Sequence, residues 1–186
     1  MNPYEYLEKS SAQTAMSRSK ISAPLRCISN EIKIGDRILH QGAGRLNNPD
    51  RSRLDELAKE VIHYDPNYSK ETEKFLGKAD FDTVVSIYVL NVLPIEIRQV
   101  AMKSVYDSLK THGVGFFAVR SMTDIKNVKK PNWAEFEDGW LVSNKGKLNF
   151  QRGYDAKSFE DELSPLFKIS VVKSAKNMII AKALKL

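Results

Sequence analysis

The segment ILHQGAGRLNN, residues 38–48, joins an apolar run to a glycine turn and a polar tail. The apolar residues predict a β-strand over Arg37 to Gln41, and Gly42 and Gly44 lie in the turn that follows. Glycine lets the backbone approach a ligand that a side chain would block. Ligands of doubly wound α/β sheets lie at the carboxyl ends of the strands, where such turns occur. The segment therefore predicts an α/β fold with a binding site at the end of its first strand.

Strand and helix patterns alternate along the rest of the chain, which predicts βαβ units and a mainly parallel sheet. The segment FDTVVSIYVL, residues 81–90, is apolar almost throughout, as expected of a central strand buried on both faces. Pro94 begins a predicted helix over 95–110, which Thr111-His112-Gly113 is expected to end. The apolar side of this helix is expected to carry Ile97, Val100, Ala101, Val105 and Leu109.

Six strands are expected in the main sheet, three before the helix over 95–110, one after it and a closing pair. The closing pair forms a hairpin, so the last strand is antiparallel to its neighbour. A polar region over 121–153 contains a second, inserted hairpin. The other predicted strands are 61–64, 114–119, 167–172 and 177–183 in the sheet, and 140–142 and 147–150 in the insertion. The other predicted helices are 52–60, 70–76 with Ser69 as its N-cap, and 155–163.

The composition is that of one globular domain: 186 residues, of which 42% are hydrophobic and 28% charged. No apolar run approaches the roughly 20 residues that span a bilayer, and the N-terminus lacks the apolar core of a signal peptide. The single cysteine, Cys27, is expected to be a small buried residue and fits a reducing compartment, so a cytoplasmic protein is expected. The net charge of +6 arises in residues 101–186, where Lys126, Lys129 and Lys130 cluster. Such a surface fits nucleic acid binding and simple solubility equally.

Asp65 follows Gly44 by roughly 20 residues, the spacing at which an acid commonly bonds the ribose of a nucleotide-type cofactor. The third glycine of a GxGxxG pattern is absent, because Asn47 stands there. This disfavours a dinucleotide, whose pyrophosphate needs the helix N-terminus. A cofactor without phosphates, such as S-adenosylmethionine, makes no such demand. A purely structural glycine turn is the alternative.

Several segments together resemble a known family. FDTVVSIYVLNVLP, residues 81–94, resembles the FDxVxxxxVLxHLP segment of class I S-adenosylmethionine-dependent methyltransferases, and ILHQGAGR is similar to their first motif. More narrowly, roughly residues 12–165 resemble the small methyltransferase-like proteins associated with DNA phosphorothioation. The quoted similarities are TAMSRSKISAPLR at 14–26, Asp65-Pro66 with Tyr68, YVLNV at 88–92 and NFQRGYDAKSF at 149–159.

The resemblance implies a Rossmann-like, doubly wound domain over 37–186 that transfers a methyl group from S-adenosylmethionine. It implies that Gly42, Ala43 and Gly44 face the cofactor's methionine end, that Asp65 holds the ribose and that the end of the third strand borders the methyl group. The cofactor-binding residues implied are His40, Gln41, Gly42, Ala43, Gly44, Asp65, Pro66, Asp80, Ser86 and Ile87. The catalytic residues implied are Tyr88 and Asn91, the substrate-contacting residues Arg18 and Lys20, and no metal is expected. Residues 1–36 would cover the site.

This sequence departs from the family pattern at three places. The family has an acid where His40 stands, which often helps to hold the cofactor's ammonium group, and a glycine where Leu46 adds bulk. A neutral histidine accepts one hydrogen bond but brings no charge. The interval between Asp65 and Asp82 is too short for a helix, a strand and a second helix. One edge strand of the usual seven is therefore predicted to be missing, together with its acid for the adenine, for which Asp80 is a candidate substitute.

Plainer roles stay open for the same residues. Asn91 is a candidate cap for the helix after Pro94, Tyr88 a candidate core residue, and Trp133 and Trp140 are more often packing residues than platforms for bases. The acceptor of the methyl group is not defined, and nucleic acid is one candidate. Two other functions remain: a catalytically silent methyltransferase-like protein that binds nucleic acid or a protein partner, and an enzyme that uses S-adenosylmethionine for other chemistry.

Overall fold

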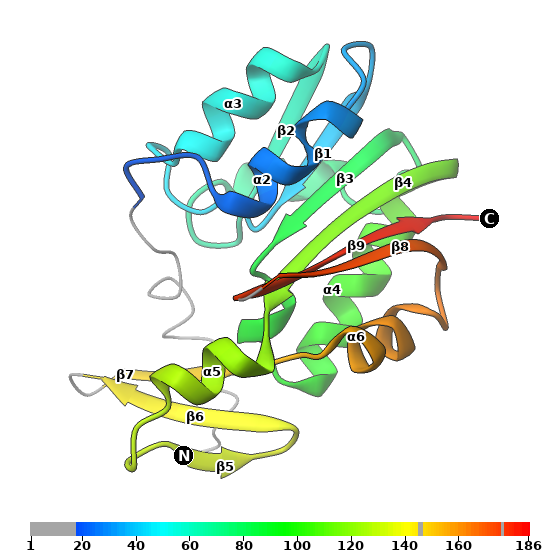
Figure 1. The fold of residues 1–186 in the computed structure, drawn as a ribbon. Coiled ribbons are helices and arrows are strands. Elements are labelled where there is room, and N and C mark those ends of the chain that lie inside the picture. The colour runs from blue at the N-terminus through cyan, green and yellow to red at the C-terminus, as the bar shows by residue number, and fades with distance from the viewer. Residues whose placement is uncertain (1–17, 145–146, 176) are drawn as a thin grey trace.

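The computed structural model describes residues 18–144, 147–175 and 177–186, and it is built around one six-stranded sheet (Figure 1). The strand order is β2-β1-β3-β4-β9-β8. The first four strands pair in parallel, and β9 is antiparallel to both β4 and β8. The strands are β1 Arg37–Gln41, β2 Glu60–Tyr64, β3 Phe81–Ile87, β4 Leu109–Arg120, β8 Lys168–Ala175 and β9 Met178–Leu184. The predicted doubly wound sheet with its closing antiparallel pair is confirmed.

The chain places β2 beside β1 at one edge and then returns to the other side of β1 to form β3. Between β2 and β3 the described chain forms η3 Lys70–Phe75, a 3-10 helix, and no strand lies beyond β2. The prediction of a missing edge strand is therefore confirmed. The strand order reverses between β1 and β3, which is where doubly wound sheets form their binding crevice.

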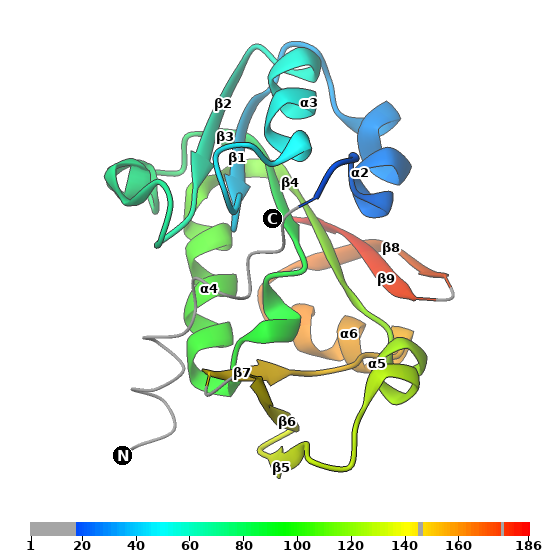
Figure 2. The ribbon, with the colours of Figure 1, turned by 90° about the vertical axis from the view of Figure 1, so that its left-hand side faces the viewer.

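Helices cover both faces of the sheet. Alternate residues of each strand point to opposite sides, so each face carries apolar side chains that helices cover. On one face, α2 Ala23–Ile28 and α3 Pro49–Leu57 pack through Leu25 and Leu54 against Val85 of β3. On the other face, α4 Ile95–Ser108 and α6 Ala156–Leu163 pack against Val84. Figure 2 shows α4 and α3 on either side of the sheet. Two separate apolar clusters result, one on each face.

The predicted buried side of α4 is partly wrong. Ile97 and Val100 are exposed, and the helix buries Arg98 and Met102 together with Val105. Arg98 can be buried because it donates to the carboxylates of Glu162 and Asp138, partners that lie far away in the sequence. A prediction from hydrophobic periodicity assigns arginine to the solvent side of the helix. It therefore placed Ile97 and Val100 on the buried side and Arg98 on the exposed side, the reverse of what the structure shows.

The end of α4 also differs from the prediction. The helix stops at Ser108, whose hydroxyl donates to the carbonyl of Ser104 and accepts from the N–H of Gly77. Residues 111–113 belong to β4 instead of a closing turn, and His112 takes a φ of 64° while its N–H donates to the carbonyl of Lys185.

Three smaller predictions are corrected at the other helices. Helix α3 begins at Pro49, before the predicted residue 52, because Asn48 is its N-cap and accepts from the N–H of Asp50. The segment after Ser69 is a 3-10 helix, and the Ser69 hydroxyl accepts from Arg51 instead of capping it. Cys27 is exposed, since it lies on the outer side of α2.

The insertion is larger than the predicted hairpin. Its strands β6 Gly139–Asn144 and β7 Lys147–Gln151 form that hairpin, whose turn lies outside the described residues. A third strand, β5 Ala134–Phe136, pairs with β6, and α5 Met122–Val128 precedes it. This small sheet lies beyond the carboxyl ends of the parallel strands (Figure 1 and Figure 2).

A cluster of four charged residues joins the insertion to the main domain. Asp138 and Arg152 belong to the insertion, whereas Arg98 and Glu162 belong to α4 and α6. Asp138 accepts from Arg98 at 2.5 Å and from Arg152 at 2.7 Å, and Arg152 also pairs with Glu162 at 2.8 Å. The two cations and two anions thus fix the small sheet against two helices of the domain.

Candidate functional site

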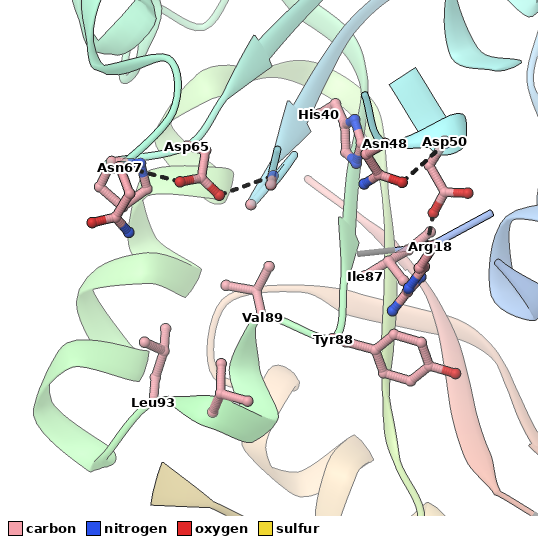
Figure 3. A pocket seen from close by; sticks show the side chains of 14 residues that line it. Arg18, His40, Asn48, Asp50, Asp65, Asn67, Ile87, Tyr88, Val89 and Leu93 are labelled. Carbon is pink, nitrogen blue, oxygen red and sulfur yellow. Dashed lines mark hydrogen bonds and ion pairs between the residues drawn. The ribbon is translucent and has the colours of Figure 1, made fainter. Parts of the chain in front are cut away.

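A pocket opens at the carboxyl ends of β1 and β3, where the strand order reverses (Figure 3). Its wall comes from five places: Arg18 before α2, the end of β1 with its glycine turn, the start of α3, the end of β2 and the end of β3 with the segment after it. Asp65 and Asn67 lie at one end of the pocket and Arg18 and Asp50 at the other. The structure therefore gathers residues from distant parts of the sequence at the predicted place.

The glycine turn is held in a backbone conformation that favours glycine. Gly42 has a φ of 68° and Gly44 a φ of 64°, both in the left-handed region. A Cβ added to Gly42 would lie 2.3 Å from Cγ2 of Val89, so the residue after β3 packs directly onto the turn. Ala43 is fully buried, and its N–H donates to the carbonyl of Tyr64 at 2.9 Å. The turn is thus tied to β2 and closely covered by Val89.

Asp65, at the end of β2, joins this turn to the next loop. Its two carboxylate oxygens accept from the N–H groups of Gly44 and Asn67, each at 2.9 Å. Each ionised oxygen can accept a further hydrogen bond, and the residue lines the pocket. Pro66 and Asn67 extend the same wall. Asp65 therefore shapes the glycine turn and still offers acceptor capacity to a ligand.

His40, at the predicted position of the missing acid, lines the pocket and is only 2% exposed. Its Nδ1 lies 3.1 Å from Nδ1 of His63, with the two rings edge to face. Burial holds the pKa of His40 well below its usual value, and the neighbouring His63 lowers it further. His40 is therefore neutral at pH 7 and brings no charge to the pocket.

A buried carboxylate that the sequence reasoning missed lies in the same pocket. Asp50, in the first turn of α3, is 1% exposed and accepts from the N–H of Ser22 at 2.7 Å. Its other oxygen faces the Arg18 guanidinium at 3.6 Å. The run Asn48-Pro49-Asp50 is a recognisable helix start, which puts Asp50 at the carboxyl edge of the sheet. The negative charge that His40 does not supply is thus supplied by Asp50 in α3, the next element along the chain.

Arg18 and Tyr88 close one end of the pocket. The guanidinium of Arg18 lies over the Tyr88 ring, 5.1 Å from its centroid. Tyr88 directly follows β3 with a φ of 61°, and burial raises the pKa of its phenol. Its hydroxyl points to the sulfur of Met178 at 3.9 Å, away from the glycine turn. Lys20 is exposed and does not line the pocket.

Two predicted cofactor-binding residues are used inside the fold. The Ser86 hydroxyl donates to Oε1 of Gln41 at 2.9 Å, and the Gln41 amide donates to the carbonyl of Ala101 at 3.0 Å. These bonds tie β1 to β3 and to α4, and neither side chain lines the pocket. Ile87, the residue after Ser86, does line it.

Three other residues lie apart from the pocket. Asp80 pairs with Arg37 at the amino ends of the strands, the opposite edge of the sheet, so it is not near a ligand at the carboxyl edge. Leu46 is 73% exposed and does not narrow the pocket. Asn91 is buried behind it and does not cap α4, since the N-cap position is Pro94 and the first helical N–H donates to Glu137.

The described residues form neither a metal site nor a membrane-spanning helix. No group of three or more histidine, cysteine or acidic side chains in these ranges could hold a metal ion. No helix in the described part of the chain is long and apolar enough to cross a membrane.

The strand order, the closing antiparallel pair and the pocket above the glycine turn define the Rossmann-like fold of class I methyltransferases. No family model and no curated protein matches the sequence. Among solved structures, the chain is similar to 1,6-didemethyltoxoflavin-N1-methyltransferase of Burkholderia thailandensis, with bound 1,6-didemethyltoxoflavin and S-adenosylhomocysteine. That match has a TM-score of 0.63 at 14% identity and covers 100% of this chain and 91% of the other.

Two more structures share the fold. An S-adenosylmethionine-dependent methyltransferase of Clostridium acetobutylicum matches with a TM-score of 0.61 at 15% identity, over 99% of this chain and 98% of its own. The N-methyltransferase NodS of Bradyrhizobium japonicum, in complex with S-adenosylhomocysteine, matches at 0.53 and 14%, over 100% and 99%. Likeness at such low identity shows the fold. The narrower resemblance to phosphorothioation-associated proteins stays a prediction.

Proposed function

We propose that this protein is an S-adenosylmethionine-dependent methyltransferase. The observation that carries the proposal is the distribution of charge along the pocket. A single carboxylate, Asp65, lies at one end, and an opposite-charge pair, Asp50 and Arg18, lies at the other. S-adenosylmethionine has the matching order of groups, with ribose hydroxyls in the middle and a zwitterionic amino acid at one end.

The residues present fit such a molecule. Asp65 would accept from the ribose hydroxyls, and the apolar side chains of Val92 and Leu93 line the same end of the pocket for the adenine. The left-handed turn at Gly42 and Gly44 would let the amino-acid end pass close to the backbone. Asp50 and Arg18 would meet its ammonium and carboxylate groups. Three structurally similar methyltransferases support the assignment: two hold S-adenosylhomocysteine and the third is S-adenosylmethionine-dependent.

When bound, S-adenosylmethionine supplies an electrophilic methyl group on a sulfonium. The protein's part would be to hold acceptor and methyl in line, because positioning supplies much of the acceleration in such displacements. Ile87 and Tyr88 line the pocket at the end of β3 and would border the methyl group. We assign no acid or base to Asn91, which the structure buries behind the pocket.

Nucleic acid is the acceptor class that we propose, in line with the resemblance to DNA phosphorothioation proteins. The support is the basic surface of the insertion, where Lys126 lies in the last turn of α5 and the Lys129 ammonium lies 4.7 Å from the centroid of the Trp140 ring. Helix α5 and strand β6, which carry these residues, lie beyond the carboxyl ends of the parallel strands (Figure 1), the edge of the sheet at which the pocket opens. Residues 1–17 of the predicted covering segment 1–36 lie outside the described residues; residues 18–36 would form a cover, since Arg18 reaches the pocket and Ser22 bonds Asp50.

Calorimetry tests the cofactor directly. Titration with S-adenosylmethionine and with S-adenosylhomocysteine should show saturable binding, and Leu46→Ala, an exposed change outside the pocket, should bind equally well. No heat from either ligand at millimolar concentration would refute the assignment. For the acceptor, a gel shift across a salt series should show affinity that falls steeply with salt, as phosphate contacts require. If the protein does not bind nucleic acid, or if its affinity does not change with salt, nucleic acid is rejected as the methyl acceptor.

A second candidate function is a catalytically silent relative, and one observation favours it. The pocket has a cavity of about 140 Å³, smaller than the roughly 300 Å³ at which small-molecule sites begin, and Val89 packs onto its glycine turn. In this case the wild type binds no cofactor, and His40→Asp together with Val89→Ala creates binding. If the cofactor binds but no methylated product forms, mass spectrometry of the cofactor's products separates other S-adenosylmethionine chemistry from methyl transfer.

A further inference from the structure

A row of three hydrogen-bonded side chains runs from the surface to the pocket. Asp55 of α3 has an exposed carboxylate that lies 3.1 Å from Nε2 of His63 on β2. The other ring nitrogen of His63 lies 3.1 Å from Nδ1 of His40 on β1. His63 is largely buried and His40 almost completely so, and His40 reaches the pocket.

The row defines which nitrogen of each ring carries a hydrogen. An ionised Asp55 can only accept, so His63 must donate from Nε2. A neutral imidazole has one donor and one acceptor, which makes Nδ1 of His63 an acceptor. His40 must then donate from its Nδ1, and its Nε2 is left with a free lone pair.

Both rings are neutral under ordinary conditions, as this reasoning requires. Burial lowers the pKa of His40, as do the nearby charges of Arg51 and Arg18. Burial also lowers the pKa of His63, against the raising effect of Asp55. If His63 carried hydrogens on both ring nitrogens, its Nδ1 would donate to His40 instead of accepting from it. This charged form is disfavoured, because His63 is mostly buried and the positive charge of Arg51 also lowers its pKa.

The free nitrogen of His40 is the one available to a ligand. Among the described residues, Nε2 of His40 has no hydrogen-bond partner, while Nδ1 is turned to His63. The ring lines the pocket beside the glycine turn, at the end where Arg18 and Asp50 lie (Figure 3). Nε2 is not among the fully buried side-chain atoms that lack a partner in the described residues, so it is open to the pocket, where a ligand's donor can reach it.

We propose that the row Asp55–His63–His40 replaces the absent acid of the first motif, by fixing Nε2 of His40 as an acceptor for a ligand's ammonium group. His40 is then the binding residue, and His63 and Asp55 are positioning residues. Asp50 supplies the negative charge nearby. This inference rests on the proposed function, because the ammonium group is that of the cofactor's amino-acid end.

Two measurements on the full chain test the row. The first is the tautomer of His40 in the ligand-free protein, read from long-range nitrogen–proton NMR correlations of the imidazole rings. We expect a hydrogen on Nδ1 and a lone pair on Nε2 in the wild type, and a mixture of tautomers in Asp55→Ala. Glu56→Ala, a neighbouring exposed acid on the same helix, is the control and should keep the wild-type pattern.

The second measurement compares two ligands by calorimetry. S-adenosylhomocysteine has the ammonium group, and methylthioadenosine shares its nucleoside but lacks the amino acid. Asp55→Ala should weaken S-adenosylhomocysteine about two- to threefold, because only the fraction of His40 that carries its hydrogen on Nδ1 can accept from the ammonium group. Methylthioadenosine should be unaffected, and Glu56→Ala should change neither ligand. A merely structural role of Asp55 would weaken both ligands alike.

The outcomes separate this inference from the proposed function. A hydrogen on Nε2 of His40 in the wild type overturns the row, whether or not any cofactor binds. Equal losses for both ligands, or no loss, in Asp55→Ala overturn its role toward the ammonium group. If the wild type binds neither ligand, the proposed function fails and the ligand part of this inference fails with it, even when the tautomer is as expected.

Discussion

Replacing Gly42 by alanine probes the contact between the glycine turn and the residue after β3. Gly42 has a φ of 68°, and an added Cβ would lie 2.3 Å from Cγ2 of Val89. The chain offers a matched control in Gly77, which has a φ of 71° and nothing within 4 Å of an added Cβ. The two substitutions therefore share the backbone strain and differ in the collision.

The expected losses follow from these two terms. A left-handed conformation costs a residue with a Cβ about 1–2 kcal/mol, which is the whole effect expected for Gly77→Ala. Overpacking adds about 1–3 kcal/mol, so Gly42→Ala should lose about 2–5 kcal/mol. In a chain of this length 1 kcal/mol shifts Tm by about 2–4 °C, which makes the difference between the variants measurable.

The assay is urea unfolding of four proteins: wild type, Gly42→Ala, Val89→Ala and the double variant. Removing both methyl groups of Val89 makes room for the new Cβ, so the double variant should recover about 1–3 kcal/mol relative to additivity. The same double variant should bind S-adenosylhomocysteine better than Gly42→Ala. Equal losses at Gly42 and Gly77, or strict additivity with Val89→Ala, would refute the argument that the two segments are in contact.

Three more predictions follow from the site and the core. Asp65→Asn replaces the carboxylate by an amide, whose single oxygen cannot accept from the N–H groups of both Gly44 and Asn67. The free energy of unfolding in urea should fall by about 1–2 kcal/mol, and S-adenosylhomocysteine should bind about tenfold more weakly by calorimetry. Unchanged binding would contradict the role of Asp65 toward the ribose. Burial lowers the pKa of His40, so the unfolded chain takes up a proton there below pH 6.5 and stability should fall on acidification. His40→Gln should reduce the change in Tm between about pH 5.5 and 7.5; a profile equal to that of the wild type would refute this cause. Arg98→Met should lose about 1–3 kcal/mol, because it removes a fully buried guanidinium and its hydrogen bonds to Glu162 and Asp138, whereas Arg53→Met at an exposed pair should lose under about 1 kcal/mol; similar losses would show that the cluster around Arg98 is unimportant.

The sheet could be predicted because its signals are local. Continuous apolar runs predicted β3, and the short interval between Asp65 and Asp82 predicted the missing edge strand. The side of α4 could not be predicted, because the burial of Arg98 depends on Asp138 and Glu162, which approach only in the folded chain. Local patterns place elements, while long-range pairing decides which polar side chains turn inward.

The same division applies to the pocket. Gly42, Gly44 and Asp65 lie together as their spacing indicated, because the ends of parallel strands meet at one edge. Asp50 was missed although the helix start at Asn48-Pro49 places it at that edge; its burial depends on a bond from Ser22 across 28 residues. The His40–His63 contact was missed as well, although parallel pairing of β1 and β2 places these residues side by side. Aligning the two predicted strands could have revealed it.

The four-residue charge cluster is balanced separately on each side of the junction between the insertion and the main domain. Asp138 and Arg152 enter with the small sheet as one anion and one cation, and Arg98 and Glu162 form a pair of their own in the main domain. Taking the sheet away would remove equal and opposite charges and leave a matched pair behind. The insertion's share of this cluster is thus electroneutral, so its gain, loss or exchange would leave Arg98 and Glu162 as a compensated pair in the host domain.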